Sequence, residues 1–228
     1  MGDVVVQRKF GANPDVQTTT DPETVWGAGG ILSDYFTPAA TTVVSDDTDD
    51  DVGGTGAITG IMHYLDSDYM MQEEEFTLDG TTPVALTAQP IFIYRAKILT
   101  AGASGYNEGT ITFSNGSTLA TIEPKEGQTL IAVYPLPKNF VAGIITHWGV
   151  QALNKVAAYA DFSLQTKKIG GAWNTRDKLG SSGEMNPNDL DIRIEPGELV
   201  RIQCNEVSAN MPVIGYFIID QHRNHAGI

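Results

Sequence analysis

The side chains best suited to hold a metal ion are the aspartates between Ser45 and Val52. Aspartates stand at positions 46, 47, 49, 50 and 51, and alternate aspartates begin the calcium-binding loop of an EF-hand. Counted from Asp47, however, the sixth position is Val52 instead of glycine, and the twelfth is Ile58 instead of the bidentate glutamate. We therefore expect a solvated acidic loop over residues 46–51, and the alternative that it binds a cation stays open.

The glutamates at positions 73–75 could supply the paired carboxylates of a glycosidase. Such an enzyme sets two acids about 5–9.5 Å apart across a cleft. Successive side chains of a strand point to opposite faces, so Glu73 and Glu75 would share one face while Phe76 and Leu78 share the other. The pattern therefore predicts the water-facing side of a strand rather than an active site.

Two further patterns that could bind a metal or carry catalysis are incomplete. His222 and His225 are closely spaced, but they lie in a C-terminal tail. Residues 102–105 lack the final glycine of a nucleophile elbow, because Tyr106 stands in its place.

The single cysteine, Cys204, is predicted to be a small core residue. It shares one face of a predicted strand with Val200 and Ile202. A reactive thiolate needs an electropositive setting, whereas Glu198 and Glu206 flank this position. Together with the incomplete patterns above, this predicts that the protein is not an enzyme and has no catalytic residue, cofactor or metal ligand.

Aromatic side chains could instead anchor a contact with another protein. Buried aromatic anchors carry much of the binding free energy of protein interfaces. Trp148 lies in a long apolar run and is predicted to be core. For Trp26 and Trp173, packing within the chain is the preferred role, and a contact with another subunit is the alternative. The residues predicted to contact another subunit or a capsid are Phe10, Trp26, Tyr35, Phe36 and Trp173.

Length and charge limit the class of protein. The chain has 228 residues, of which 28 are acidic and 14 basic, and its formal net charge is −14. Without a basic cluster, nucleic acid is not expected as a partner, because that binding depends on cationic contacts with phosphates. The chain start lacks the pattern of a signal peptide, and no apolar run approaches the ~20 residues that span a bilayer. Neither export nor a membrane partner is therefore expected.

The elements that position these residues are predicted to be β-strands. Short alternating runs are separated by Asn-Gly, Asp-Gly and Pro-Gly turns, which is typical of a sandwich or barrel. Both faces of the run at 140–153 are apolar, so this strand should be central, although a helix over 150–159 competes with it. The predicted strands occupy residues 57–65, 70–78, 91–99, 109–113, 129–134, 140–153, 157–166, 190–194, 199–207 and 213–219.

The first part of the chain differs in composition from the rest. Residues 1–52 are rich in Gly, Pro, Thr and Asp, with scattered apolar residues. We predict that they form an extended N-terminal arm, packed either on its own domain or on a neighbouring subunit. Residues 53–228 are predicted to form one antiparallel, jelly-roll-like β-sandwich domain.

Several short stretches point to one family. They include Phe-Gly-Ala-Asn-Pro-Asp-Val at 10–16 and Asp-Pro-Glu-Thr-Val-Trp-Gly-Ala-Gly-Gly at 21–30. Others follow in order at 53–57, 64–66, 74–78, 80–84, 101–102 and 107–111, with looser ones at 128–130, 132–134 and 195–198. The sequence resembles a family of virion structural proteins of tailed bacteriophages. The acidic residues 46–51 depart from the short turn of small residues expected there.

The resemblance implies a particle component without catalytic residues. The leading hypothesis is a capsid decoration, or cement, protein that binds the major capsid protein on the outer surface of the virion. We expect it to be made in the host cytoplasm and to form a homo-oligomer, with a trimer as the expected form.

Two alternatives belong to other classes. The protein could be a tail or fibre adaptor or a host-glycan-binding module, which would gather exposed aromatic residues on one concave surface. It could also be a jelly-roll polysaccharide lyase, for which only Tyr94, Arg95 and Lys97 on one predicted strand give a hint.

Overall fold

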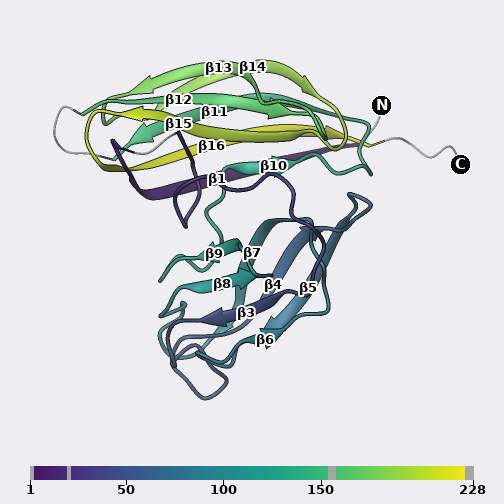
Figure 1. Cartoon of the computed structure of the whole chain (residues 1–228), viewed down its shortest axis with the longest axis vertical. Helices are drawn as coiled ribbons and strands as arrows, with labels where there is room; N and C mark the ends of the chain where they lie inside the picture. The colour runs from purple at the N-terminus through teal and green to yellow at the C-terminus, as the bar shows by residue number, and fades with distance from the viewer. Residues whose placement is uncertain (1–2, 20–21, 154–157, 224–228) are drawn as a thin grey trace, which may run out of the picture. The chain divides into compact units, whose positions relative to one another are not determined.

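The protein is built from antiparallel β-strands. The structure, a computed structural model, describes residues 3–19, 22–153 and 158–223 (Figure 1). Within these ranges every helix or strand assigned is a strand, and every strand pairing is antiparallel. The prediction of an all-β fold is confirmed. The chain divides into unit 1, Met1–Leu32 with Ile131–Ile228, and unit 2, Ser33–Leu130.

Unit 1 is a jelly roll. Its first sheet has the strand order β1-β16-β11-β14, and its second has the order β10-β15-β12-β13 with β2 beside β15. The strands are β1 (Val4–Val16), β2 (Glu23–Thr24), β10 (Val133–Pro135), β11 (Ala142–Ala152), β12 (Ala160–Lys167), β13 (Asn174–Ser181), β14 (Asn186–Ile194), β15 (Leu199–Val207) and β16 (Met211–His222).

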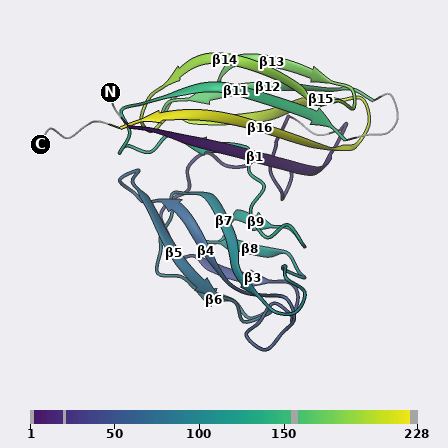
Figure 2. The ribbon, with the colours of Figure 1, turned by 180° about the vertical axis from the view of Figure 1, so that it is seen from behind.

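The strand pairs of unit 1 are nested along the chain. The innermost pair is β12 with β13, followed by β11 with β14, β10 with β15 and, outermost, β1 with β16. One long hairpin rolled into two facing sheets has this order, so the jelly-roll prediction is confirmed. In Figure 2, which shows the molecule from behind, the sheet that contains β1, β16 and β11 faces the viewer.

The side chains between the two sheets are apolar and alternate along each strand. In β16, Val213, Phe217 and Ile219 are fully buried, and Ile214, Tyr216 and Ile218, which alternate with the buried positions, are partly exposed. Trp148 is also fully buried, and its indole N–H donates a hydrogen bond to Asp177 Oδ2 at 2.9 Å. The predictions that Trp148 is core and that its strand is central are confirmed, because β11 lies between β14 and β16.

A bulge in β11 changes which of its residues face the core. The pairing with β16 slips between Ile145 and His147. Before the slip Gly143 and Ile145 face inward, whereas after it Trp148 and Val150 do so. Strict alternation along the whole strand, as the sequence pattern predicts, is therefore wrong, because the bulge inserts one extra residue.

Unit 2 contains two antiparallel sheets, of order β6-β3-β8-β9 and β5-β4-β7. An edge-to-face contact between Phe76 and Phe113, with ring centroids 5.3 Å apart, contributes to its core. The predicted strands at 57–65, 70–78, 91–99 and 109–113 are confirmed to within two residues. The strands are β3 (Thr42–Ser45), β4 (Ala57–Leu65), β5 (Met71–Thr77), β6 (Val84–Ala85), β7 (Phe92–Ala101), β8 (Ile111–Ser114) and β9 (Thr118–Ile122).

A buried carboxylate joins three segments of unit 2. Asp50 is completely buried. It accepts hydrogen bonds from Ser45 Oγ at 2.6 Å, from Ala57 N at 2.7 Å, and from Glu108 N and Gly109 N at 2.9 and 3.0 Å. For Asp50 the expectation of a solvated loop is therefore wrong, because the chain folds the carboxylate inward onto donors from distant residues.

The N-terminal segment is divided differently from the expected arm and domain. We expected residues 1–52 to precede the sandwich, whereas Val4–Val16 forms an edge strand of the jelly roll and residues 33–52 belong to unit 2. The physical reason is pairing at long range, since β1 forms its ladder with β16 at the other end of the chain. Composition alone contains no sign of that partner. The helix that competed over residues 150–159 falls partly outside the described residues, and β11 continues to Ala152.

We expect Asp50→Asn to lower the free energy of unfolding by about 2–4 kcal/mol, because an NH₂ group would face buried donors that now have an acceptor. Urea denaturation followed by circular dichroism measures this. Asp49→Asn is the matched control in the same loop, since Asp49 is exposed, and it should stay within about 0.5 kcal/mol of the wild type. Equal midpoints for the two variants would contradict the structural role of Asp50.

We expect the Cys204 thiol to be unreactive in the folded protein. It is 1% exposed, and burial raises its pKa from 9.0 to about 12. Because the folded pKa is the higher one, protonation of this thiol stabilises the fold below about pH 9, and that contribution is lost as the pH rises towards 12. Labelling with a disulfide reagent at pH 8 should be at least about 100-fold slower than in urea. Similar rates in both conditions would show that the site is open.

Candidate functional site

The acidic residues that suggested glycosidase chemistry face solvent. Glu73 and Glu75 are exposed on β5, and Phe76 is buried on its other face, as predicted. Glu73 Oε2 lies 3.5 Å from His63 Nδ1 beside a shallow pocket of about 200 Å³ that Tyr94 also lines. The arrangement pairs one partly exposed histidine with one exposed carboxylate, and a surface contact of this kind contributes little to stability.

The other chemical hints are dispersed. Among the residues that the structure describes, no three His, Cys, Asp or Glu side chains are grouped so that they could hold a metal ion. His225 lies outside the described residues. Tyr94 is buried while Lys97 is exposed, and Arg95 lies on the opposite strand face from Tyr94, so these residues do not converge on a groove.

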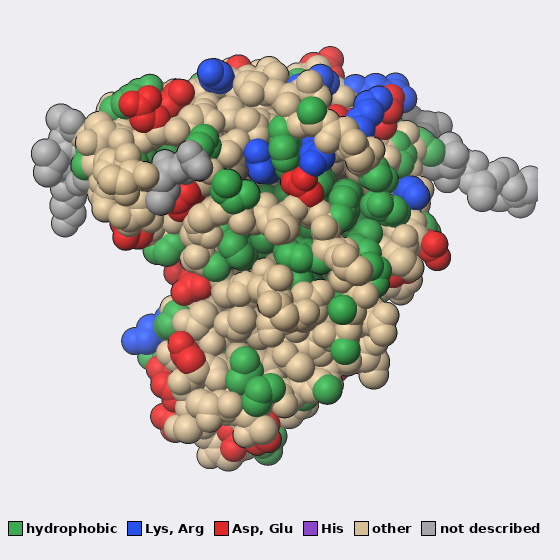
Figure 3. All heavy atoms as spheres, in the orientation of Figure 1, with side chains coloured by type: hydrophobic (Ala, Val, Ile, Leu, Met, Phe, Trp, Pro, Cys, Tyr) green, Lys and Arg blue, Asp and Glu red, His purple; other side chains and the backbone are tan. Residues whose placement is uncertain are grey.

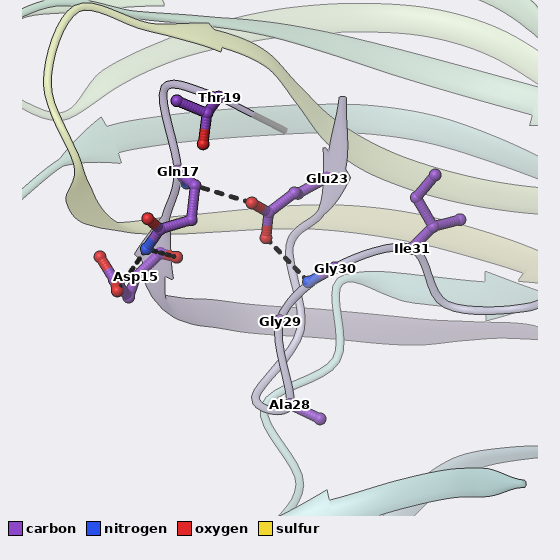
Figure 4. Close-up of a pocket in the computed structure, with 8 residues that line it drawn as sticks. All are labelled: Asp15, Gln17, Thr19, Glu23, Ala28, Gly29, Gly30 and Ile31. Atoms are coloured by element: carbon purple, nitrogen blue, oxygen red, sulfur yellow. Dashed lines mark hydrogen bonds between the residues drawn. The ribbon is translucent and has the colours of Figure 1, made fainter. Parts of the chain in front are cut away.

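An open pocket of about 580 Å³ lies beside Glu23 in unit 1 (Figure 4). Glu23 is 4% exposed. Its Oε1 accepts a hydrogen bond from Gln17 N at 3.1 Å, and its Oε2 accepts bonds from Gly30 N at 2.8 Å and Asn13 Nδ2 at 2.9 Å. The carboxylate therefore joins β1, the loop that follows it and the loop that follows β2, and acts as a structural tie.

The five predicted contact residues do not share one environment. Trp26 is 5% exposed and donates its indole N–H to Gly30 O at 3.3 Å, so it packs inside unit 1. Tyr35 in unit 2 packs edge-to-face on Tyr69 at 5.2 Å, and burial raises its pKa well above the usual range. Phe36 is half-buried in the same unit. These three residues take part in packing within the chain.

Phe10 is the most exposed of the predicted contact residues and lies in an apolar strip. It is 43% exposed on β1, where it pairs with Tyr216 of β16, and Val4 and Val6 on the same strand face are 49% and 53% exposed. Ile218 lies two residues after Tyr216 on β16 and is half-buried on the same face of the sheet. We call Val4, Val6, Phe10, Tyr216 and Ile218 the Phe10 strip.

Trp173 lies on the other sheet of unit 1, in the loop between β12 and β13. The Arg201 guanidinium stacks over its ring with 3.8 Å to the centroid, and Lys167 lies 5.8 Å from the same centroid. Arg201 is also held by Gln165 and Gln203 through hydrogen bonds of 2.9 and 3.0 Å. Trp173 is therefore half-buried and packs on the Arg201 guanidinium, whose position is held by these hydrogen bonds.

Beside this loop lies a basic pocket that the sequence analysis missed. The pocket, of about 390 Å³, is lined by residues from the two loops that close one end of the jelly roll and by Arg176 and Arg193. A signal was present in the sequence, because six of the 14 basic residues lie between positions 165 and 201. They are Lys167, Lys168, Arg176, Lys178, Arg193 and Arg201.

The negative charge is distributed unevenly between the two units. Unit 2 holds 15 of the 28 acidic residues but only 3 of the 14 basic ones, and 3 minus 15 gives a formal net charge of −12. The remaining −2 belongs to unit 1. Figure 3 shows Lys and Arg side chains gathered over the unit that contains β12 to β15.

The described residues include no helix long and apolar enough to cross a lipid bilayer.

Comparisons with known proteins give matches in structure only. No protein-family model matches the sequence, and no curated protein matches it. Among solved structures, the VP2 subviral particle of infectious bursal disease virus has a TM-score of 0.25 and 9% identity, covering 96% of this chain and 72% of that chain. The STIV MCP has a TM-score of 0.24 and 9% identity, with 96% and 97% covered. These neighbours are viral capsid proteins, and at such TM-scores the likeness does not establish a common topology.

Proposed function

We propose that the protein is a non-enzymatic structural component of a virus particle, and specifically a decoration, or cement, protein of a tailed bacteriophage. It binds the major capsid protein on the outer surface of the capsid and acts as a homo-oligomer, with the trimer as the expected form. It is made in the host cytoplasm before it joins the particle. The sequence resemblance to virion structural proteins motivates this proposal, and the Phe10 strip is the observation that carries it.

The Phe10 strip has the properties of a contact surface. Its three β1 side chains are among the most exposed large apolar residues of unit 1, and they adjoin half-buried Tyr216 and Ile218. Exposed apolar side chains that gather on one face mark protein contacts, and here Arg8 and Asp220 stand among them on the same strand face. The strip also lies at a sheet edge, where unpaired backbone groups can pair with another chain.

Charge favours a second copy of this chain as the occupant of the strip. Copies that carry −14 each repel one another, and contact through unit 2, with −12, would concentrate that repulsion. The strip belongs to unit 1, with −2, and its strand face includes both Arg8 and Asp220. Association through this face brings apolar groups together with the least electrostatic cost.

A decoration protein gains affinity by repetition. Several copies joined through one surface present several identical capsid-binding sites, so each further contact forms at a high effective concentration. No chemistry is required of such a protein. The buried carboxylates Asp50 and Glu23, whose oxygens are occupied by backbone donors, suit a structural role.

A tail or fibre adaptor or a host-glycan-binding module is the second candidate function. The basic pocket at the end of unit 1 favours it, because recognition of a small ligand needs a concave site with fixed polar groups. Trp26 and Trp173 lie apart from each other, which favours the decoration protein. A sugar-binding surface built from aromatic side chains would have them side by side.

We expect Phe10→Ser to weaken self-association by about tenfold to a hundredfold, because an apolar anchor at an interface is lost. Multi-angle light scattering over a dilution series measures the mass of the wild type, expected to be a trimer, and of the variant. Tyr159→Ser is the matched control, since Tyr159 is an aromatic residue of unit 1 with a similar exposure of 46%. A variant with unchanged dissociation would remove the strip from the subunit contact.

We expect the wild-type oligomer to co-sediment with undecorated capsids of its phage and to raise the temperature at which they rupture. Phe10→Ser should reduce retention on the capsid at low protein concentration, because fewer sites are joined. An oligomer that does not co-sediment with capsids would instead support the tail or fibre candidate.

A further inference from the structure

The basic pocket of unit 1, which favours the second candidate function, has no part in the capsid contact proposed for the decoration protein. It lies where the loop between β12 and β13 approaches the turn between β14 and β15, and its volume is about 390 Å³. Arg176 extends from β13 and Arg193 from β14, which are edge strands of the two different sheets. Both arginines are therefore supplied by strands of the jelly roll and not by its loops.

The two arginines are available for a ligand. In the described part of the chain neither guanidinium takes part in a hydrogen bond or a close ion pair, although Arg193 lies near enough to Glu195 to lower the pKa of that carboxyl. By contrast, Lys168 is already paired with Glu195, whose Oε2 lies 2.7 Å from the lysine nitrogen. That pair raises the pKa of Lys168 and lowers the pKa of Glu195, chiefly through their hydrogen bond. The pocket thus holds the ion pair of Lys168 and Glu195, to which Arg193 adds a weaker attraction for Glu195, and two guanidinium groups whose hydrogen-bond donors remain available.

The remaining lining groups are hydrogen-bonding side chains. Glu198 is 6% exposed, and one of its oxygens accepts a bond from Glu195 N at 3.0 Å. Asn174 and Thr166 contribute an amide and a hydroxyl to the wall. Carboxylate, amide and hydroxyl groups at fixed positions are partners for the hydroxyl groups of a ligand.

The mixture of charges selects among anionic ligands. A guanidinium binds a carboxylate or a phosphate through two parallel hydrogen bonds. Glu198 in the same wall repels a compact multiply charged anion such as phosphate, whereas the charge of Glu195 is balanced by Lys168. A ligand with a single carboxylate and several hydroxyls satisfies the arginines and the glutamates together, and a volume of about 390 Å³ lies in the range of small-ligand pockets.

We propose that this pocket binds a saccharide that carries a carboxylate, with Arg176 and Arg193 donating hydrogen bonds to the carboxylate and with Glu198 and Asn174 accepting hydrogen bonds from sugar hydroxyls. Uronic acids and sialic acids share this chemistry. The site is independent of the Phe10 strip, so it adds a ligand to the decoration protein and does not depend on capsid binding.

Isothermal titration of the full-length protein tests the proposal with matched ligands. Methyl glucuronoside and N-acetylneuraminate are the two acidic probes and distinguish a uronic from a sialic acid, methyl glucoside is the neutral counterpart, and inorganic phosphate is the simple anion. We expect one acidic sugar to bind, the neutral sugar not to bind, and phosphate to bind more weakly. Salt should weaken the binding, because the carboxylate contact is electrostatic.

Variants locate the binding. Arg176→Ala and Arg193→Ala should each weaken it by at least about tenfold, as expected for charge-assisted hydrogen bonds. Lys178→Ala is the control, since it removes an exposed cation of the same strand that does not line the pocket. Because both arginines are exposed, thermal melts of these variants should match the wild type.

Three results would overturn the proposal. They are the absence of heat from either acidic sugar at about 10 mM, undiminished binding by the double variant Arg176→Ala/Arg193→Ala, and phosphate binding as tight as that of the sugar. Because all titrations use isolated protein, their outcome is separate from that of the capsid experiment.

Discussion

Closure of the jelly roll depends on the pairing of β1 with β16, the outermost of its four nested pairs. Because unit 2 is inserted after β1, this pair joins residues near the two ends of the chain. The chain loses the entropy of closing that whole loop before the ladder forms, and pairing over such a separation slows folding. β1 also passes very close to the start of β10, since a Cβ on Gly11 would lie 2.3 Å from Ala132 N. Only a residue without a side chain fits there.

The same strand links the fold to the proposed function. At an edge, β1 is paired on one side, and its outward side chains lie beside only one strand. Phe10 therefore stays exposed although its neighbours Lys9 and Gly11 on the inner face are buried. The free edge and the exposed apolar side chains of β1 are not covered by any other described part of unit 1. A second copy of the chain can bury these side chains at β1 without any change in the fold of either copy. The low charge of unit 1 allows that approach in a protein that is otherwise strongly anionic.

Several carboxylates join segments of the chain through hydrogen bonds, although their residue type alone would also suit a metal site or an active site. Asp50 ties three segments of unit 2, Glu23 ties the loop after β1, and Asp177 accepts the indole N–H of Trp148 in the core. Each takes charge-assisted hydrogen bonds from donors that would otherwise be buried without partners. Acidic residues on the surface of unit 2 remain as net charge, whereas the cations concentrate at the end of unit 1, where the two arginines of the basic pocket meet.

The sequence by itself determined the all-β class, most strands of both units and the burial of Cys204 and Trp148, because alternation and turn residues are local properties. Only the tertiary structure decided that β1 completes a jelly roll and that unit 2 interrupts it, since pairing with β16 depends on residues some two hundred positions away. The bulge at Thr146 reversed the facing of half of β11 for a similar reason, because its partner strands set the register. Of the five predicted contact residues, Phe10 is exposed on the proposed contact face and Trp26 is packed inside. Arg176 and Arg193, from strands of different sheets, could be brought to one pocket only by the folding of those sheets onto each other.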